Sequence, residues 1–82
     1  MLSVKVTVTL KPGVLDPQGK TVRNALESLG FKGLLDLRIG KVMEIRMDGL
    51  SPKEARGQVE EMCQKLLANP VIEDYRYEIE QV

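Results

Sequence analysis

Histidine and tryptophan are absent from this chain of 82 residues, and cysteine occurs only once. Without histidine, the chain cannot form a Ser-His-Asp or Cys-His catalytic group, and it lacks the commonest protein ligand of metal ions. A single cysteine rules out an internal disulfide. Domains this small usually need a disulfide, a metal or a partner to be stable. Since the first two are disfavoured, we expect the chain to associate with other chains.

An excess of charge of one sign is also missing, because 12 basic residues balance 12 acidic ones. Nucleic-acid binding usually requires a patch of positive charge, and here the basic residues are spread along the chain. Its aromatic residues, one Phe and two Tyr, are too few for the stacking surface of an RNA-binding sheet. No apolar run is long enough to span a membrane, and the N-terminus lacks the features of a signal peptide. We therefore expect a cytoplasmic protein that binds neither nucleic acid nor membrane.

The first part of the sequence predicts a strand followed by a helix. Residues 2–10 alternate between apolar and polar side chains, which is the pattern of a half-buried strand. Asp16 can cap a helix that begins at Pro17, and Gly30 stands where a C-terminal cap belongs. The helix is expected over residues 17–29, with an apolar stripe of Val22, Ala25, Leu26 and Leu29.

A hairpin of two strands is predicted next. Residues 35–39 and 43–47 each alternate, and Gly40 marks the turn between them. A three-residue loop, Gly40-Lys41-Val42, keeps the apolar faces together, because directly opposed residues of an antiparallel pair point to the same side. This register pairs Ile39 with Met43, Leu37 with Ile45 and Leu35 with Met47, and it sets Arg38 opposite Glu44 and Asp36 opposite Arg46.

The last part predicts a second helix and a final strand. Ser51-Pro52-Lys53-Glu54 is a capping box with proline at the first helical position, and Asn69-Pro70 ends the helix. The apolar stripe of this helix comprises Ala55, Val59, Met62, Cys63, Leu66 and Leu67. The final strand then alternates nearly to Val82, with Tyr75, Tyr77 and Ile79 on one face.

These elements follow the order β-α-β-β-α-β in one domain, residues 1–82. With right-handed crossovers, this order forms a ferredoxin-like α+β fold, in which an antiparallel four-stranded sheet carries two helices on one face. The second and fourth strands would be the edges of that sheet. The fourth strand is long, and its exposed edge is a place where another chain can dock.

Motifs of catalysis or cofactor binding are weak. Cys63 lies in an apolar stripe and is interpreted as a small core residue. The pairs Glu60-Glu61 and Glu73-Asp74 lack the third donor of a metal site. The segment Gly13–Thr21 resembles a phosphate-binding loop, but its glycines have one residue too many between them, and its acidic cap opposes phosphate. We predict no catalytic, cofactor-binding or metal-binding residue.

The run Lys11-Pro12-Gly13-Val14-Leu15 leaves one alternative open. It resembles the Pro-Gly turn of ACT domains, ferredoxin-like modules that bind amino acids at subunit interfaces, and a glycine there would let a ligand approach the backbone. In ACT domains the helix follows the turn at once, whereas Asp16-Pro17 comes between them here. A small-molecule-binding regulatory domain is therefore our second hypothesis.

Four segments remain distinctive: Gly13–Gly19 (Gly-Val-Leu-Asp-Pro-Gln-Gly), Leu29-Gly30-Phe31, Arg38-Ile39-Gly40-Lys41 with Glu44, and Asn69–Tyr75. Together they resemble the PurS family, the small subunit of phosphoribosylformylglycinamidine (FGAM) synthase. The resemblance covers essentially the whole chain, in order. The Leu-Asp-Pro-Gln-Gly run and the Arg-x-Gly-Lys turn are its most specific parts.

The resemblance implies a three-component enzyme of purine biosynthesis. A synthetase subunit (PurL) uses ATP and magnesium to activate formylglycinamide ribonucleotide, and a glutaminase subunit (PurQ) releases ammonia from glutamine. PurS-like chains form homodimers or higher homo-oligomers and bridge these two subunits, which supports ammonia transfer. The chain would thus belong to a carbon–nitrogen ligase without being catalytic itself, and it would hold no cofactor.

Four residues are the candidates for contacts with partner chains: Asp16, Gln18, Arg38 and Lys41. Asp16 and Gln18 lie in a loop that is more elaborate than a helix cap requires, although a cap with a tight turn also explains it. Arg38 and Lys41 flank the predicted turn. The competing interpretation is a cross-strand pair between Arg38 and Glu44 with a solvated lysine, since exposed pairs contribute only about 0–1 kcal/mol.

Overall fold

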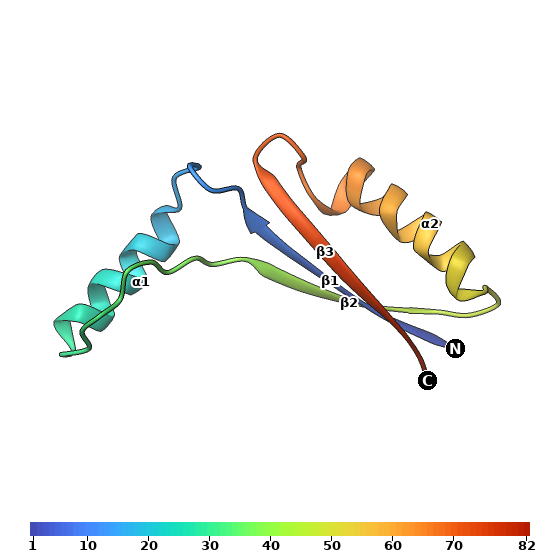
Figure 1. Ribbon diagram of the computed structural model, residues 1–82, viewed down its shortest axis with the longest axis horizontal. Coiled ribbons are helices and arrows are strands. Elements are labelled where there is room, and N and C mark those ends of the chain that lie inside the picture. The colour runs from blue at the N-terminus through green and yellow to red at the C-terminus, as the bar shows by residue number, and fades with distance from the viewer.

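The computed structural model describes residues 1–82 and has three strands and two helices (Figure 1). The elements are β1 (Leu2–Leu10), α1 (Pro17–Ser28), β2 (Lys41–Met47), α2 (Pro52–Met62), a π-helical turn (Cys63–Leu67) that continues α2, and β3 (Glu73–Gln81). The chain is α+β, as predicted. Both predicted helices are present, and so are three of the four predicted strands.

The three strands form one antiparallel sheet in the order β2-β1-β3. Leu2 of β1 lies opposite Met47 of β2 and opposite Gln81 of β3. Because side chains alternate along a strand, this register puts the apolar residues of all three strands on one face. The final strand β3 is an edge, as predicted, and β2 is the other edge.

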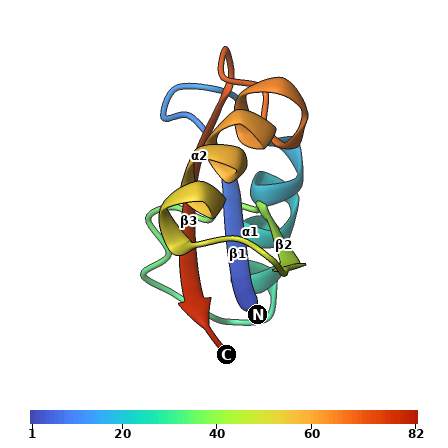
Figure 2. The ribbon, with the colours of Figure 1, turned by 90° about the vertical axis from the view of Figure 1, so that its right-hand side faces the viewer.

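Helix α2 covers the apolar face of the sheet (Figure 2). Ala55, Val59 and Cys63 are completely buried in the core that this helix forms with β1. Cys63 is therefore the small core residue that the sequence predicts. The hydroxyl of Tyr75 on β3 donates a hydrogen bond to Glu60 Oε1 at 2.9 Å, which ties the helix to the edge strand.

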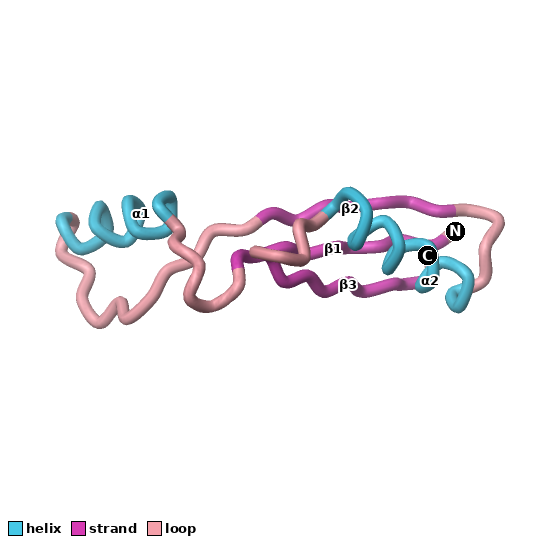
Figure 3. Tube along the Cα trace, turned by 90° about the horizontal axis from the view of Figure 1, so that it is seen from above, coloured by secondary structure: helices cyan, strands magenta, loops and turns pink.

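Helix α1 lies beyond the end of the sheet, which corrects the prediction that both helices cover one face (Figures 1 and 3). With the segment 29–39 that returns to the sheet, α1 forms an arm, and the molecule measures 50 × 28 × 15 Å. Only Gly19 of this helix is buried, and Leu29 at its end is 75% exposed. The apolar stripe correctly predicted a helix, but a stripe does not specify which surface will cover it.

Residues 35–39 form no strand, so the predicted hairpin is absent and the sheet has three strands instead of four. The chain runs from this segment straight into β2, without a turn at Gly40 (Figure 1). Gly40 does not have a positive φ, but a Cβ at this position would collide with the backbone oxygen of Val8. The glycine is needed for close approach of two backbones, and sequence alone does not separate that role from a turn.

The predicted cross-strand pairs change with the loss of the hairpin. Glu44 lies opposite Lys5 instead of Arg38, and Ile45 lies opposite Val4 instead of Leu37. Pairing β2 with β1 keeps the apolar residues on one face just as the hairpin would have done. The alternation was therefore predicted correctly. The pairing of the first and third predicted strands, which the ferredoxin-like order implies, is present, and the error is the second strand, which is missing from the outer edge of β2.

Candidate functional site at the elbow

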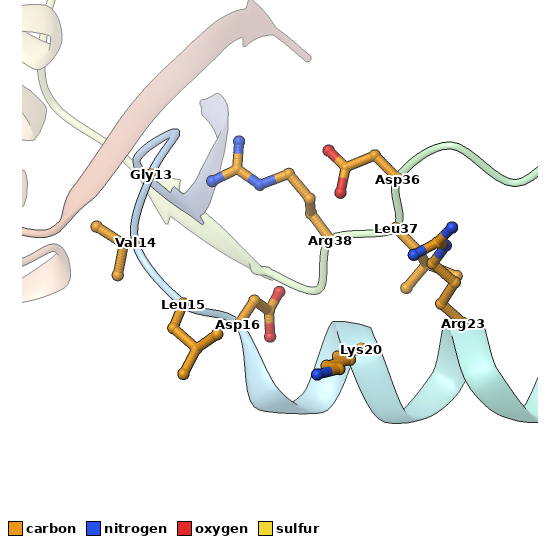
Figure 4. A pocket seen from close by; sticks show the side chains of 9 residues that line it. All are labelled: Gly13, Val14, Leu15, Asp16, Lys20, Arg23, Asp36, Leu37 and Arg38. Carbon is orange, nitrogen blue, oxygen red and sulfur yellow. The ribbon is translucent and has the colours of Figure 1, made fainter.

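Two connections join the arm to the sheet, residues 11–19 and residues 36–41, and we call this region the elbow (Figure 4). The elbow contains all four candidates for partner contacts, Asp16, Gln18, Arg38 and Lys41. The structure thus brings together two motifs that are about twenty residues apart in the sequence.

Asp16 joins the two sides of the elbow. Its Oδ1 accepts a hydrogen bond from the backbone N–H of Gly19, which caps α1, and its Oδ2 accepts one from the N–H of Ile39, both at 2.9 Å. These bonds, with that from Ile39 first, hold the pKa of the Asp16 carboxyl below its usual value, and the charge of Arg38 adds to the effect. The sequence predicted the cap but not the bond across the elbow.

Replacing Asp16 with asparagine should lower thermal stability at neutral pH but not in acid. Asparagine has one acceptor oxygen and turns an NH₂ group toward the second N–H, so one of the two bonds is lost. Because folding lowers the pKa of Asp16, its contribution to stability is complete above the ordinary pKa and disappears as the pH falls through the lower, folded value. We expect the melting temperature to drop by a few degrees at about pH 7, and the gap between the two proteins to narrow as the pH falls below the ordinary pKa of an aspartate side chain. Melting curves across this range measure it, and a gap independent of pH would contradict the role of the carboxylate.

Gly19 lets α1 and the returning segment come into contact. A Cβ at this position would collide with the backbone oxygen of Leu37. Pro17 is the first residue of the helix, where its missing N–H does no harm. Asp16, Pro17, Gly19 and Gly40 therefore have roles in building the elbow. The side chains of Gln18, Arg38 and Lys41 are exposed and are not needed for it.

A hollow of about 370 Å³ lies between the two sides of the elbow (Figure 4). It is lined by three basic and two acidic side chains, Lys20, Arg23, Arg38, Asp16 and Asp36. The sequence analysis singled out Arg38 but missed Lys20 and Arg23. Their spacing of three residues along α1 was the available signal, because residues three apart on a helix are neighbours on its surface.

Gln18 and Lys41 line a second hollow, of about 330 Å³. Asp16 lines both hollows. The four candidates are thus close in space but divide between two recesses, with Arg38 in the first. Nowhere in the chain do three Cys, Asp or Glu side chains come together as a metal site would require, and no helix is long and apolar enough to cross a bilayer.

Residues 3–81 match the model of a protein family described as PurS, phosphoribosylformylglycinamidine (FGAM) synthase. The chain belongs to the PurS family. The resemblance predicted from four short segments is therefore confirmed over nearly the whole chain. The alternative of an ACT-like regulatory domain is not supported.

Individual PurS proteins are similar to this chain over its full length. The FGAM synthase subunit PurS of Bacillus subtilis is 54% identical over 82 residues, which cover 100% of this chain and 96% of that protein. The crystal structure of Methanocaldococcus jannaschii PurS, one of the subunits of formylglycinamide ribonucleotide amidotransferase in the purine biosynthetic pathway, matches with a TM-score of 0.89. It is 41% identical and covers 100% of this chain and 99% of its own.

A third similarity is to a chain in the structure of PurLQS from Thermotoga maritima. It is 27% identical, has a TM-score of 0.85, and covers 98% of this chain and 99% of its own. Scores this high over whole chains mean that these PurS structures share the extended arm as well as the sheet. PurS is a subunit of FGAM synthase in purine biosynthesis, and the elbow belongs to that subunit's fold.

Proposed function

We propose that this chain is the non-catalytic small subunit of FGAM synthase in de novo purine biosynthesis, where it joins the glutaminase subunit (PurQ) to the synthetase subunit (PurL). The family match over residues 3–81 is the observation that carries the proposal. The similarity to a chain of the Thermotoga maritima PurLQS structure supports the assembly. In this proposal ATP and magnesium bind to the synthetase subunit, and the enzyme works in the cytoplasm.

The shape of the chain suits a bridge between two larger proteins. The arm and the sheet present separate surfaces at the two ends of a molecule 50 Å long. A bridge raises the local concentration of one subunit near the other, and it can favour the conformation that it binds better. Neither effect needs a reactive side chain. Holding the two active sites in one complex would support the transfer of ammonia between them.

We also propose that two copies exchange arms to form a homodimer, from which higher homo-oligomers can be built. Only 10 of the 82 residues are buried in a single copy. Because α1 lies beyond the end of the sheet, α2 is the only helix that covers the apolar face. Large apolar side chains of the arm are exposed, among them Val22, Leu29, Phe31 and Leu35. Such a surface marks a contact with another chain.

An exchanged arm would complete the ferredoxin-like fold across the dimer. The outer edge of β2 is free, so residues 35–39 of a second copy can pair with it as the fourth strand. The α1 helix of that copy would then supply the second helix on the apolar face. Exchange of an element between identical chains is a common route to dimers, and a straightened hinge such as the one at Gly40 is what it requires.

Glutamine-dependent FGAM synthesis by the other two subunits, measured with and without this chain, tests the proposed function. We expect a rate roughly tenfold or more higher with the chain, because it brings glutaminase and synthetase together. Synthesis from added ammonium salt serves as the control, because free ammonia reaches the synthetase without a bridge. Equal glutamine-dependent rates with and without the chain would overturn the proposal.

A further inference from the structure

The outer side of β3 is the longer of the two unpaired edges of the sheet. β3 has nine residues, contains no proline, and pairs with β1 without interruption from Glu73 to Gln81. No further strand pairs with its outer side (Figure 3). Soluble proteins usually protect such an edge with a proline, a bulge or a covering segment, because the edge can pair with another chain. The arm does not supply this cover, since in the proposed exchange it pairs with β2 at the opposite edge.

The free hydrogen-bonding groups of this edge belong to the odd-numbered residues of β3. The N–H of Lys11 donates to the backbone oxygen of Ile72 at 2.8 Å, and the N–H of Val82 donates to that of Met1 at 2.9 Å. Even-numbered residues therefore turn their backbone groups toward the side of β1, because the N–H and C=O of one residue point the same way and successive residues alternate. The outward N–H and C=O groups are those of Glu73, Tyr75, Tyr77, Ile79 and Gln81.

We propose that β3 pairs with β3 of a second copy, antiparallel, with Tyr77 opposite Tyr77 on a two-fold axis. Odd-numbered residues then lie opposite odd-numbered residues, so the outward N–H and C=O groups of each copy bond to those of the other. Tyr75 lies opposite Ile79 of the second copy. Directly opposed residues point to the same face, so the apolar faces of the two sheets join into one continuous face.

The charged side chains of β3 favour this register over its two neighbours. Arg76 and Glu78 form no ion pair within one chain, and here each lies opposite the other across the axis, so symmetry gives two pairs of opposite charge. An axis moved by one residue would set Arg76 against Arg76 or Glu78 against Glu78, which is destabilising. Asp74 lies opposite Glu80, but the Nζ of Lys11 is 2.7 Å from Asp74 Oδ1 and offsets this repulsion.

Edge pairing adds to the exchange of arms and does not replace it. The two contacts use opposite edges of the sheet, so one copy can take part in both. The β3 edge contributes mainly backbone hydrogen bonds, each with a modest net stabilisation, and its apolar side chains are already half-buried in one copy. Pairing through β3 should therefore require a higher protein concentration than the exchange of arms, and it would build oligomers larger than a dimer.

Reversing one charge at a time tests the register. Arg76→Glu sets glutamate against Glu78, and Glu78→Arg sets arginine against Arg76, so each variant should repel its own copies. In an equal mixture each variant meets opposite charges on the other, and the mixture serves as the matched control because it contains the same substitutions. We expect each variant alone to lose roughly tenfold or more in affinity at low salt, and the mixture to associate as the unmodified chain does.

Light scattering at increasing concentration measures this association. The unmodified chain and the mixture should form oligomers larger than a dimer, at concentrations where each variant alone forms none. A mixture that associates no better than its components would overturn the register. An unmodified chain that never exceeds a dimer would overturn the pairing itself.

Hydrogen exchange on the unmodified chain tests the pairing without a substitution, which matters because Glu78→Arg places an arginine opposite Lys5 and can weaken the fold. The outward N–H groups of Tyr75, Tyr77 and Ile79 should exchange roughly tenfold more slowly at a concentration where about nine-tenths of the edges are paired. The N–H groups of even-numbered residues of β3, which point toward β1, should show no such change. Equal exchange of the outward groups in dilute and concentrated protein would contradict the proposal.

A strand of another subunit is the alternative occupant of this edge. If the outward N–H groups become protected only when the partner subunits are added, and mixing the two variants restores nothing, the pairing of two copies is overturned and the edge is assigned to that subunit. The proposed function is tested separately by glutamine-dependent synthesis with and without the chain. Failure of the edge pairing would therefore leave that function standing.

Discussion

Gly40→Ala is expected to destabilise the chain strongly. The added Cβ would collide with the backbone oxygen of Val8 and would lie 2.8 Å from Cγ2 of Thr9. The backbone can give way only by disturbing the pairing of Val8 with Lys41, where β1 and β2 meet. Overpacking of this kind costs about 1–3 kcal/mol, and a backbone obstacle places it at the upper end.

The matched control for this substitution is Gly57→Ala in α2. A Cβ at Gly57 would meet no atom within 4 Å, and the residue lies inside an exposed stretch of helix. Alanine is favoured over glycine in a helix by about 0.5–1 kcal/mol, so this variant should be slightly more stable. Urea unfolding followed by circular dichroism measures both, and each kcal/mol corresponds to a shift of about 4–8 °C in melting temperature for a domain of this size. Two effects of the same sign would contradict the close contact at Gly40.

Leu29→Asp combined with Leu35→Asp is expected to dissociate the proposed homodimer. These side chains are 75% and 92% exposed in a single copy, so the fold of one chain loses little when they are replaced. Complete burial of a leucine stabilises by about 1.5–3 kcal/mol. Because each of the two copies contributes both leucines, four such contacts are lost, about 6–12 kcal/mol, which raises the dissociation constant by roughly 10⁴-fold or more.

The control for the arm variant carries two equally exposed apolar residues that lie outside the arm. Leu66→Asp with Val71→Asp changes side chains that are 83% and 80% exposed, near the end of α2 and in the turn before β3. Light scattering after gel filtration distinguishes the monomer of 9.2 kDa from a dimer of twice that mass. The control should remain dimeric at a concentration where the arm variant is monomeric. A dimer that persists in the arm variant, or an unmodified chain that is monomeric at all concentrations, would contradict the exchange of arms.

Local features of the sequence were sufficient for most of the elements. The start of α1 at Pro17 follows from its acidic cap, and the capping box of Ser51 and Glu54 is present at the start of α2. β1 occupies residues 2–10 as its alternation predicts, and Cys63 lies in the core. These predictions succeed because caps and alternation depend on neighbours within a few residues.

Only part of the candidate site could be predicted from local sequence patterns. Arg38 and Lys41 were predicted as contacts because they flank the expected turn at Gly40, and the structure places them at the elbow with Asp16. In the sequence Lys20 is an ordinary surface residue of a helix, and only the returning segment shows that it lines the same hollow as Arg38. The hollow is made by segments distant in the sequence, so no local pattern predicts it.

The sequence by itself determined the class of the fold, the faces of the strands and helices, and the family. The tertiary structure decided which surfaces those faces contact: residues 35–39 do not pair with the outer edge of β2, and α1 extends away from the sheet. The physical reason is that a periodic apolar pattern shows that one face must be buried, but it does not determine which surface covers that face. The same chain or a second copy can cover an apolar stripe with a similar gain in free energy, so the stripe alone does not decide between them.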